Sequence, residues 1–234
     1  MSSAPRWPQT AEQMIAAQLA LAASDPPLWR PAYPAGLQVG SAWVCFERGR
    51  PGPGAAGDQA WAAAVSMRGR QVSEHTLLSG QAASGYVPGL LGLRVGSLLL
   101  AAIRHLVRRP HGLILDATGR DHPRRAGLAA HLGAILDLPT VGVTHRPLVA
   151  SGDWPSDATD ATAPLTLDGE IVGYWVRTRV GRRPIAVHAA WRTDAATAVD
   201  IVLACKGRMR TPAPLRRARQ VAREARARHE DGGR

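Results

Sequence analysis

The chain has 234 residues, of which 45% are hydrophobic, which is typical of one globular domain with a sizeable core. Its 29 Lys and Arg outnumber its 18 Asp and Glu and give a formal net charge of +11. The two cysteines, Cys45 and Cys205, exclude a disulfide framework and a multi-cysteine zinc site. No apolar run approaches the ~20 residues of a membrane span, and the N-terminus lacks a signal peptide's apolar centre, so we expect a cytoplasmic protein without a membrane partner.

The basic balance, with an isoelectric point of about 11.2, favours a polyanionic partner such as DNA or RNA. Almost all the basic residues are arginine, and the chain is rich in alanine, glycine and proline. A high-GC coding bias produces the same usage. Charge therefore suggests nucleic acid as a partner without establishing it.

The first predicted elements are a helix and three strands. Thr10 and Gln13 have capping-box spacing ahead of apolar residues at helical intervals, which predicts a helix over residues 10–23. Strands are expected at residues 37–47, 60–67 and 71–78, and a second helix at residues 90–107. The short Arg68-Gly69-Arg70 connection indicates that the second and third strands form a hairpin.

The most informative stretch covers residues 112–145. Its opening Leu113-Ile114-Leu115 is a continuous apolar run, as expected of a strand buried on both faces. The run ends on Asp116, which would then lie at the carboxyl edge of the strand, where open α/β sheets place their ligands. A polar turn, a helix at 128–136 and a short strand at 140–144 are expected to follow.

The last part of the chain alternates between loop, strand and helix signals. Residues 151–164 are rich in Ala, Asp, Thr and Pro and predict a flexible loop. Strands are expected at 170–178 and 184–191, followed by a helix that begins at Asp194. Residues 215–230 carry arginine every three or four positions, which fits either contacts with phosphates or a solvated terminal helix with Arg/Glu pairs.

Several motifs together resemble one enzyme family. The central stretch reads Asp116-x-x-Gly119-x-x-His122-Pro123-Arg124-Arg125-x-Gly127-x-Ala129-x-His131-x-Gly133, followed by Leu-Pro-Thr-Val-Gly-Val at 138–143. This pattern resembles endonuclease V, a metal-dependent nuclease that cuts nucleic acid near deoxyinosine or inosine. Residues 86–91 resemble that family's wedge motif, although Gly85 stands where the family usually has proline. Residues 202–205 and 210–214 resemble its closing helix and tail.

The resemblance implies an α/β protein with a ribonuclease H-like fold, in which helices flank a mixed central sheet. The predicted order agrees, because three antiparallel strands precede helix, strand, helix and strand. We therefore expect an N-terminal helix and connection at residues 1–36, an endonuclease V-like domain at 37–214 and a basic C-terminal tail at 215–234.

The metal site that the resemblance implies lacks most of its ligands. Hydrolysis with two metal ions needs several carboxylates that converge within a few ångström. Placed by neighbouring motifs, the family's first Asp falls on Trp43, its Glu on Val95 and its His on Trp191, so that only Asp116 is kept. The family's lysine becomes His145. We therefore expect no metal ligand set and no cofactor, and Mg²⁺ or Mn²⁺ only if the protein is still a nuclease.

The residues that the resemblance assigns to base recognition match the family better than those it assigns to the metal site. In the family a flipped base lies in a pocket that maps here onto Gly119, His122 and Gly127, and Ala117 adds a methyl group that would narrow it. The expected nucleic-acid contacts are the wedge and the two arginines, namely Tyr86, Val87, Pro88, Gly89, Arg124 and Arg125.

Three functions remain open. The first is a binding protein for DNA or RNA with inosine or unpaired bases that does not cleave it. The second is a repurposed enzyme that converts a small organic molecule in an apolar pocket lined by Trp43, Val95 and Trp191. Its candidate catalytic residues are Asp116, His122 and His145, with His188 as a further acid–base group in the pocket. The third is a divergent metal-dependent endonuclease. The oligomeric state stays undetermined.

Overall fold

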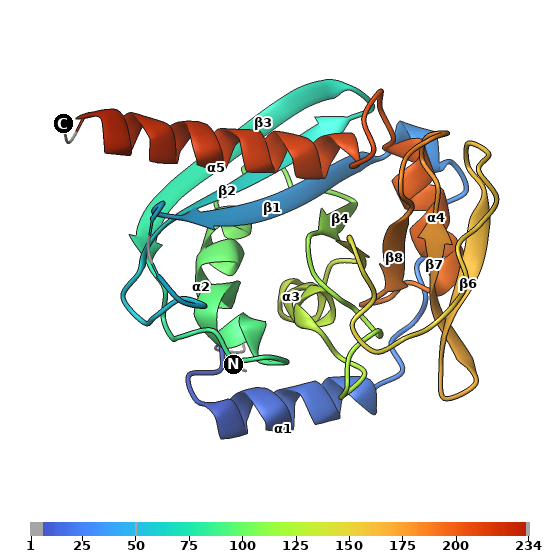
Figure 1. Ribbon diagram of the computed structural model, residues 1–234, viewed down its shortest axis with the longest axis horizontal. Coiled ribbons are helices and arrows are strands. Elements are labelled where there is room, and N and C mark those ends of the chain that lie inside the picture. The colour runs from blue at the N-terminus through green and yellow to red at the C-terminus, as the bar shows by residue number, and fades with distance from the viewer. Residues whose placement is uncertain (1–6, 50, 233–234) are drawn as a thin grey trace.

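The computed structural model describes residues 7–49 and 51–232. Within them, eight strands form one mixed sheet in the order β3-β2-β1-β4-β5-β8-β7-β6 (Figure 1). The strands are β1 (Gln38–Phe46), β2 (Gln59–Arg68), β3 (Gln71–Gln81), β4 (Gly112–Leu115), β5 (Thr140–Thr144), β6 (Thr162–Leu167), β7 (Glu170–Val176) and β8 (Ile185–Ala189). The helices are α1 (Ala11–Ala22), the short 3-10 helix η1 (Pro34–Gly36), α2 (Leu91–Arg104), α3 (Leu128–Leu136), α4 (Ala195–Ala204) and α5 (Ala213–Gly232).

The centre of the sheet is parallel and its flanks are antiparallel. β4 lies between β1 and β5 and runs parallel to both, and the other neighbours pair antiparallel. All four residues of β4 are buried, which explains their continuous apolar sequence. The register pairs Leu115 with Ala42 and with Gly142, so Trp43 in β1 comes beside Asp116.

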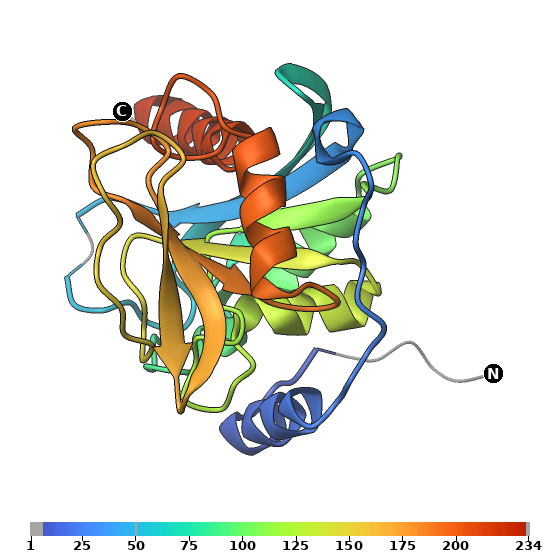
Figure 2. The ribbon, with the colours of Figure 1, turned by 90° about the vertical axis from the view of Figure 1, so that its right-hand side faces the viewer.

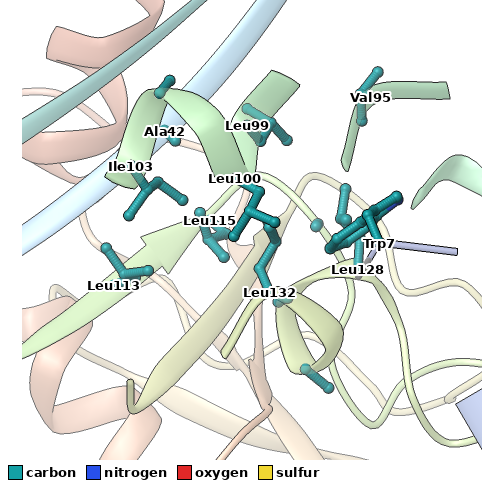
Figure 3. Packing of buried hydrophobic residues seen from close by; sticks show 14 of the residues in the cluster. Trp7, Ala42, Val95, Leu99, Leu100, Ile103, Leu113, Leu115, Leu128 and Leu132 are labelled. Carbon is teal, nitrogen blue, oxygen red and sulfur yellow. The ribbon is translucent and has the colours of Figure 1, made fainter. Parts of the chain in front are cut away.

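Helices cover both faces of the sheet. Leu113 and Leu115 pack with α2, α3 and the start of α1 on one face (Figure 3). Ile114 points to the other face and packs with α4. Figure 2 shows α4 in front of the strands and α1 at the bottom of the molecule. The alternation of β4 side chains thus divides the core into two layers, as a ribonuclease H-like α/β fold requires.

The helix predicted at the N-terminus is present and capped as expected. Thr10 is its N-cap, and its side chain accepts a hydrogen bond from the Gln13 backbone N–H at 3.2 Å. Across the described residues, no helix is both long and apolar enough to cross a membrane.

The predicted loop ends in a strand. β6 begins within the last three residues of the stretch 151–164 that was expected to be flexible, and it pairs antiparallel with β7 as the last strand of the sheet. Pro164 is tolerated there because an edge strand has backbone N–H groups without ladder partners. The connection to β7 is Asp168-Gly169, and both residues have positive φ, 51° and 81°. That dipeptide is a strong signal for a tight hairpin turn, and it was the sequence feature that could have revealed β6.

The arginine-rich tail is a helix that packs against the sheet. α5 runs along β1 and β2 (Figure 1), and its apolar side chains join a buried cluster with Trp61 and Val65. Its buried residues include Leu215, Ala218, Val221, Ala222 and Ala225. The predicted terminal helix and its Arg/Glu pairing are present, since Arg226 pairs with Glu230 at 3.7 Å. One face of the helix is not solvated, because its small residues at helical spacing form a seam that lies on the strands. The division at residues 36 and 214 stays a prediction.

Candidate functional site

Asp116 lies directly after β4 at the carboxyl edge of the parallel strands, as predicted. Its Oδ2 accepts a hydrogen bond from Trp43 Nε1 at 3.1 Å and another from Arg219 Nη2 at 2.6 Å. Arg219 comes from α5 and forms an ion pair with Asp116, and their side chains are 17% and 28% exposed. The carboxylate for which the sequence resemblance predicts a metal-binding role is therefore bound to a guanidinium.

More positive charge surrounds this ion pair. The Arg223 guanidinium lies 5.0 Å from the centre of the Trp43 ring. His145 is exposed, and its pKa is lowered, first by partial burial and then by the charges of Arg210 and Arg219, with Asp116 acting in the opposite direction. His145 is thus mostly neutral near pH 7 and lies in a basic environment.

These residues do not fit a two-metal centre. Trp43 and Val95 offer no oxygen ligand for a metal ion. The Asp116 carboxylate, which would have to bind the metal ion, is already paired with the Arg219 guanidinium. Across the parts of the chain that the structure describes, no three His, Cys, Asp or Glu side chains come close enough together to hold a metal. Asp116 and its neighbours therefore form a salt bridge and not a metal-binding site.

Two cavities meet at Asp116. The first has a volume of about 180 Å³ and is lined by residues from α1, the wedge loop, the turn after β4 and the start of α3. The second, of about 260 Å³, lies between β1, α2 and α3 and is mainly apolar, with Trp43 and Val95 in its lining. Leu91, Asp116, Ala117 and Leu128 border both. The cavity beside Trp43 and Val95, where the sequence resemblance predicts carboxylates, is therefore mainly apolar.

The two glycines predicted for the base pocket are required by close packing. A Cβ on Gly119 would lie 2.0 Å from the Ala189 carbonyl oxygen, and one on Gly127 would lie 2.3 Å from the Thr118 carbonyl oxygen. The turn after β4 therefore approaches β8 and the start of α3 so closely that no side chain fits. The glycines position this turn, and Ala117, Thr118 and His122 supply its cavity-lining atoms.

The wedge loop stands at the mouth of the first cavity. Tyr86 lines this cavity and is 44% exposed, and Val87 is 45% exposed. Gly89 has a φ of +74°, and its carbonyl oxygen lies within hydrogen-bonding distance of three side chains. The donors are Gln18 Nε2 at 3.1 Å, His122 Nε2 at 3.1 Å and Arg124 Nη2 at 2.9 Å. The base of the wedge is therefore held firmly while its tip faces outward.

His122, a candidate catalytic residue, is held on both ring nitrogens. Its Nδ1 accepts the backbone N–H of Arg124 at 3.2 Å, so the hydrogen is assigned to Nε2, which faces the Gly89 carbonyl. Burial lowers its pKa, and the Gly89 carbonyl acts in the opposite direction. His122 is therefore a neutral group that joins the wedge to the turn after β4.

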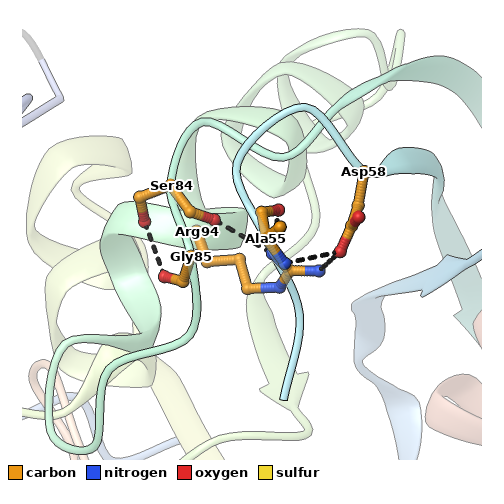
Figure 4. Close-up of polar contacts among 5 residues, drawn as sticks. All are labelled: Ala55, Asp58, Ser84, Gly85 and Arg94. Carbon is orange, nitrogen blue, oxygen red and sulfur yellow. Dashed lines mark hydrogen bonds and ion pairs between the residues drawn. The ribbon is translucent and has the colours of Figure 1, made fainter. Parts of the chain in front are cut away.

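A buried arginine that the sequence reasoning missed supports the wedge from behind. Arg94 forms an ion pair with Asp58 at 2.6 Å and donates to the carbonyls of Ala55 and Ser84 at 2.6 and 2.9 Å (Figure 4). It also lies over the Phe46 ring, 4.1 Å from the centre. Arg94 thereby fixes the chain just before Tyr86. Its partners are distant in sequence, so no local pattern identified them.

His188 and Asp121 form a second buried network. His188 has no exposed surface, and its Nε2 lies 2.8 Å from Thr144 Oγ1 while Nδ1 lies 3.5 Å from Asp121 Oδ2. Burial lowers the pKa of His188, and the nearby Asp121 carboxylate acts against this. Asp121 accepts three backbone N–H groups, from Leu148, Val149 and Ala150, at 2.6 to 2.8 Å. His188 thus reaches the first cavity only through Thr144, whereas Leu148 lines that cavity directly.

Trp191 is not at the site, which corrects its predicted place in the pocket. Its backbone N–H donates to Thr140 Oγ1 at 3.0 Å, and its carbonyl accepts from the Thr140 N–H at 2.9 Å. Thr140 begins β5, whereas Asp116 follows the end of β4, and these two strands are parallel. Trp191 therefore lies at the opposite edge of the sheet, and the side chain that the C-terminal region brings to Asp116 is Arg219.

The two predicted nucleic-acid arginines both have partners within the protein. Arg124 Nε donates to Gln18 Oε1 at 2.6 Å, in addition to its contact with Gly89. Arg125 forms ion pairs with Asp168 at 2.9 Å and Glu170 at 3.2 Å, both at the β6–β7 turn. The Arg124 side chain therefore joins the wedge to α1. The Arg125 side chain is partly exposed and lies beside two carboxylates. Their contact with nucleic acid stays a prediction.

The mixed sheet with a carboxylate at the carboxyl edge of β4 places the protein in the ribonuclease H-like α/β class. The sequence profile of the family described as endonuclease V matches residues 52–220. The chain is 38% identical to endonuclease V of Roseiflexus castenholzii over 175 residues, which are 74% of this chain and 79% of the relative. This chain therefore belongs to the endonuclease V family.

Solved structures agree with this assignment. The crystal structure of endonuclease V from Streptomyces avermitilis has a TM-score of 0.82 and 32% identity, and the alignment covers 96% of both chains. A more distant endonuclease V, from Ciona intestinalis, was solved in complex with a 24mer DNA containing an inosine followed by a ribo-adenosine. It shares the fold at a TM-score of 0.65 and 21% identity, over 81% of this chain and 85% of that one.

Proposed function

We propose that this protein binds DNA or RNA that contains inosine or another unpaired base and does not hydrolyse it. The observation that carries this proposal is the environment of Asp116, whose Oδ2 accepts from Arg219 and Trp43. Two-metal hydrolysis would need that oxygen and further carboxylates as ligands. Its relatives are named as nucleases, so the proposal concerns a change within the family.

The wedge and the first cavity support binding. An exposed aromatic ring at a cavity mouth suits insertion beside a base that has left its stack. The cavity offers Asp116, Thr118 and His122 as polar groups within a mainly apolar lining. The net charge of +11 adds a general attraction to phosphates. The structure of the Ciona relative with inosine-containing DNA is a precedent within the family.

A repurposed enzyme is the second candidate. The second cavity favours it, because about 260 Å³ of mainly apolar space ends on Asp116 and suits a small organic ligand. Against it, Asp116 is paired with Arg219 and His122 is held on both ring nitrogens, which leaves His145 as the most accessible acid–base group. A divergent nuclease would need metal ligands other than the family's and has the least support.

The test is binding of inosine-containing single-stranded and duplex oligonucleotides at low salt, alongside a cleavage assay with Mg²⁺ or Mn²⁺. We expect binding without products, weakened about 10-fold or more by Tyr86→Ala, since stacking on one aromatic is worth ~1–3 kcal/mol. Tyr33→Ala is the matched control, because Tyr33 is an 83% exposed tyrosine in the connection before β1. Absence of any binding would reject the proposal and leave a small-molecule function.

A further inference from the structure

The cations near Asp116 form a group with an excess of positive charge, and we call Arg210, Arg219 and Arg223 the arginine cluster. Arg219 contacts Asp116, Arg223 lies over Trp43, and Arg210 donates to the Pro184 carbonyl at 2.7 Å. Within the described residues, Asp116 is the one carboxylate that forms an ion pair with a member of the cluster. Among the described residues, Arg210 and Arg223 therefore form no ion pair with a carboxylate.

Two members of the cluster, Arg210 and Arg219, lie close enough to affect each other electrostatically. The pKa of Arg210 is lowered by burial and then by the charges of Arg183 and Arg219. The pKa of His145 is lowered by burial and then by Arg210 and Arg219. Like charges held this close repel each other, and an anion placed among them relieves that repulsion. The cluster thus has an unmet preference for a second anion besides Asp116.

Arg219 has donors left for such an anion. Within the described residues its guanidinium makes one hydrogen bond, through Nη2 to Asp116, and a guanidinium carries several further N–H groups. Its side chain is partly exposed, and Asp116 borders both cavities. A phosphate beside Arg219 would therefore lie next to the cavity that would hold the base.

We propose that the arginine cluster, with Arg219 at its centre, binds a backbone phosphate of nucleic acid directly, so that binding requires no divalent ion. Guanidinium groups match phosphate geometry and form short, charge-assisted hydrogen bonds to it. This inference rests on the proposed function and adds to it the group that is contacted and the means of contact. Asp116 then acts as an internal competitor that occupies Arg219 while no phosphate is bound.

The competitor role makes Asp116→Asn the sharpest variant. Removing its charge releases Arg219, so affinity for nucleic acid is expected to rise severalfold. A protein that holds phosphate through metal on Asp116 would lose affinity with the same change. The two mechanisms therefore predict opposite signs for one substitution.

The experiment measures the affinity of a single-stranded inosine-containing oligonucleotide across a salt series, with EDTA and then with Mg²⁺. We expect equal affinity in both, tighter binding by Asp116→Asn and about 10-fold weaker binding by Arg219→Gln. Arg219→Gln should also lower the salt-dependence slope by about 1, as loss of one phosphate contact does. Arg219→Lys keeps the charge and should lie between Arg219→Gln and wild type.

The control is Arg70→Gln, since Arg70 is an exposed arginine in the turn between β2 and β3. Thermal melting of each variant separates loss of binding from loss of folding. Wild-type binding that EDTA abolishes, or that Arg219→Gln weakens no more than Arg70→Gln, overturns this inference while the proposed function stands. No wild-type binding at low salt overturns both.

Discussion

At the scale of single residues, each buried or half-buried carboxylate near the site has a specific partner. Asp116 forms an ion pair with Arg219, and Asp58 forms one with Arg94. Asp121 accepts hydrogen bonds from three backbone N–H groups. Sequence patterns placed Asp116 directly after β4 and Tyr86 in the connection before α2, because the neighbouring strand and helix are strongly patterned. The partners could not be found that way, since each comes from a remote segment that only folding brings near.

Asp121 offers a first test at this scale. Asp121→Ala removes a buried acceptor and leaves three backbone N–H groups at Leu148, Val149 and Ala150 without it. We expect a loss of about 3 kcal/mol in the free energy of unfolding, measured by urea denaturation. Asp153→Ala is the control, because Asp153 is exposed, and it should change stability by less than about 0.5 kcal/mol. Equal effects would contradict the role given to Asp121.

Burial of His131 is expected to make the free energy of unfolding depend on pH. This histidine is buried against Trp7 with ring centres 4.6 Å apart, and burial lowers its pKa from 6.5 to about 4. The unfolded chain binds the proton more readily, so stability is complete above pH 6.5 and is lost as pH falls toward 4. The loss attributable to His131 is at most about 3 kcal/mol.

The measurement is the melting temperature between pH 7.5 and 4 for wild type and for His131→Gln. The variant should lose less stability on acidification, although burial of His188 acts in the same direction and will leave part of the effect. His105→Gln, a change at an exposed histidine, is the control for the loss of a histidine as such. A profile that His131→Gln does not flatten would show that this histidine is accessible to protons.

At the scale of elements, the periodicity of apolar residues predicted those helices and strands whose formation depends mainly on local sequence. The strands β1, β4 and β5 and the helices α1, α3 and α4 lie within one or two residues of their expected bounds. β6 was missed because its composition is that of a loop and its stability comes from pairing with β7. Trp191 was misplaced because spacing along the chain does not say at which edge of a sheet a residue emerges.

α5 is the element whose packing matters most to the site, because it carries Arg219 and Arg223. Ala222→Asp would place a carboxylate in the seam between α5 and the strands, where Ala222 has no exposed surface. We expect a loss of at least about 3 kcal/mol in the free energy of unfolding, together with weaker nucleic-acid binding. Gln220→Asp, on the exposed side of the same helix, removes a hydrogen bond to Glu224 and should cost no more than about 1 kcal/mol.

At the scale of the whole molecule, the chain has the family's fold and carries an ion pair, Asp116–Arg219, at the carboxyl edge of its central strands. Asp116 lies beside both cavities, and the first of these is lined by the wedge and by the turn after β4. Helix α5 supplies Arg219, the positive charge that pairs with Asp116. Class and family followed from sequence motifs. The ion pair between Arg219 and Asp116 could not be predicted from motifs, because its two partners lie 103 positions apart in the sequence.

The most direct test of this account is a time course of inosine-containing single-stranded DNA and RNA with the protein in Mg²⁺ and in Mn²⁺. Wild type and Asp116→Ala are compared, and binding is followed in the same samples. We predict bound, intact strands in every sample over hours. Cleavage by wild type that Asp116→Ala abolishes would contradict the account, because Asp116 would then hold a catalytic metal in place of Arg219.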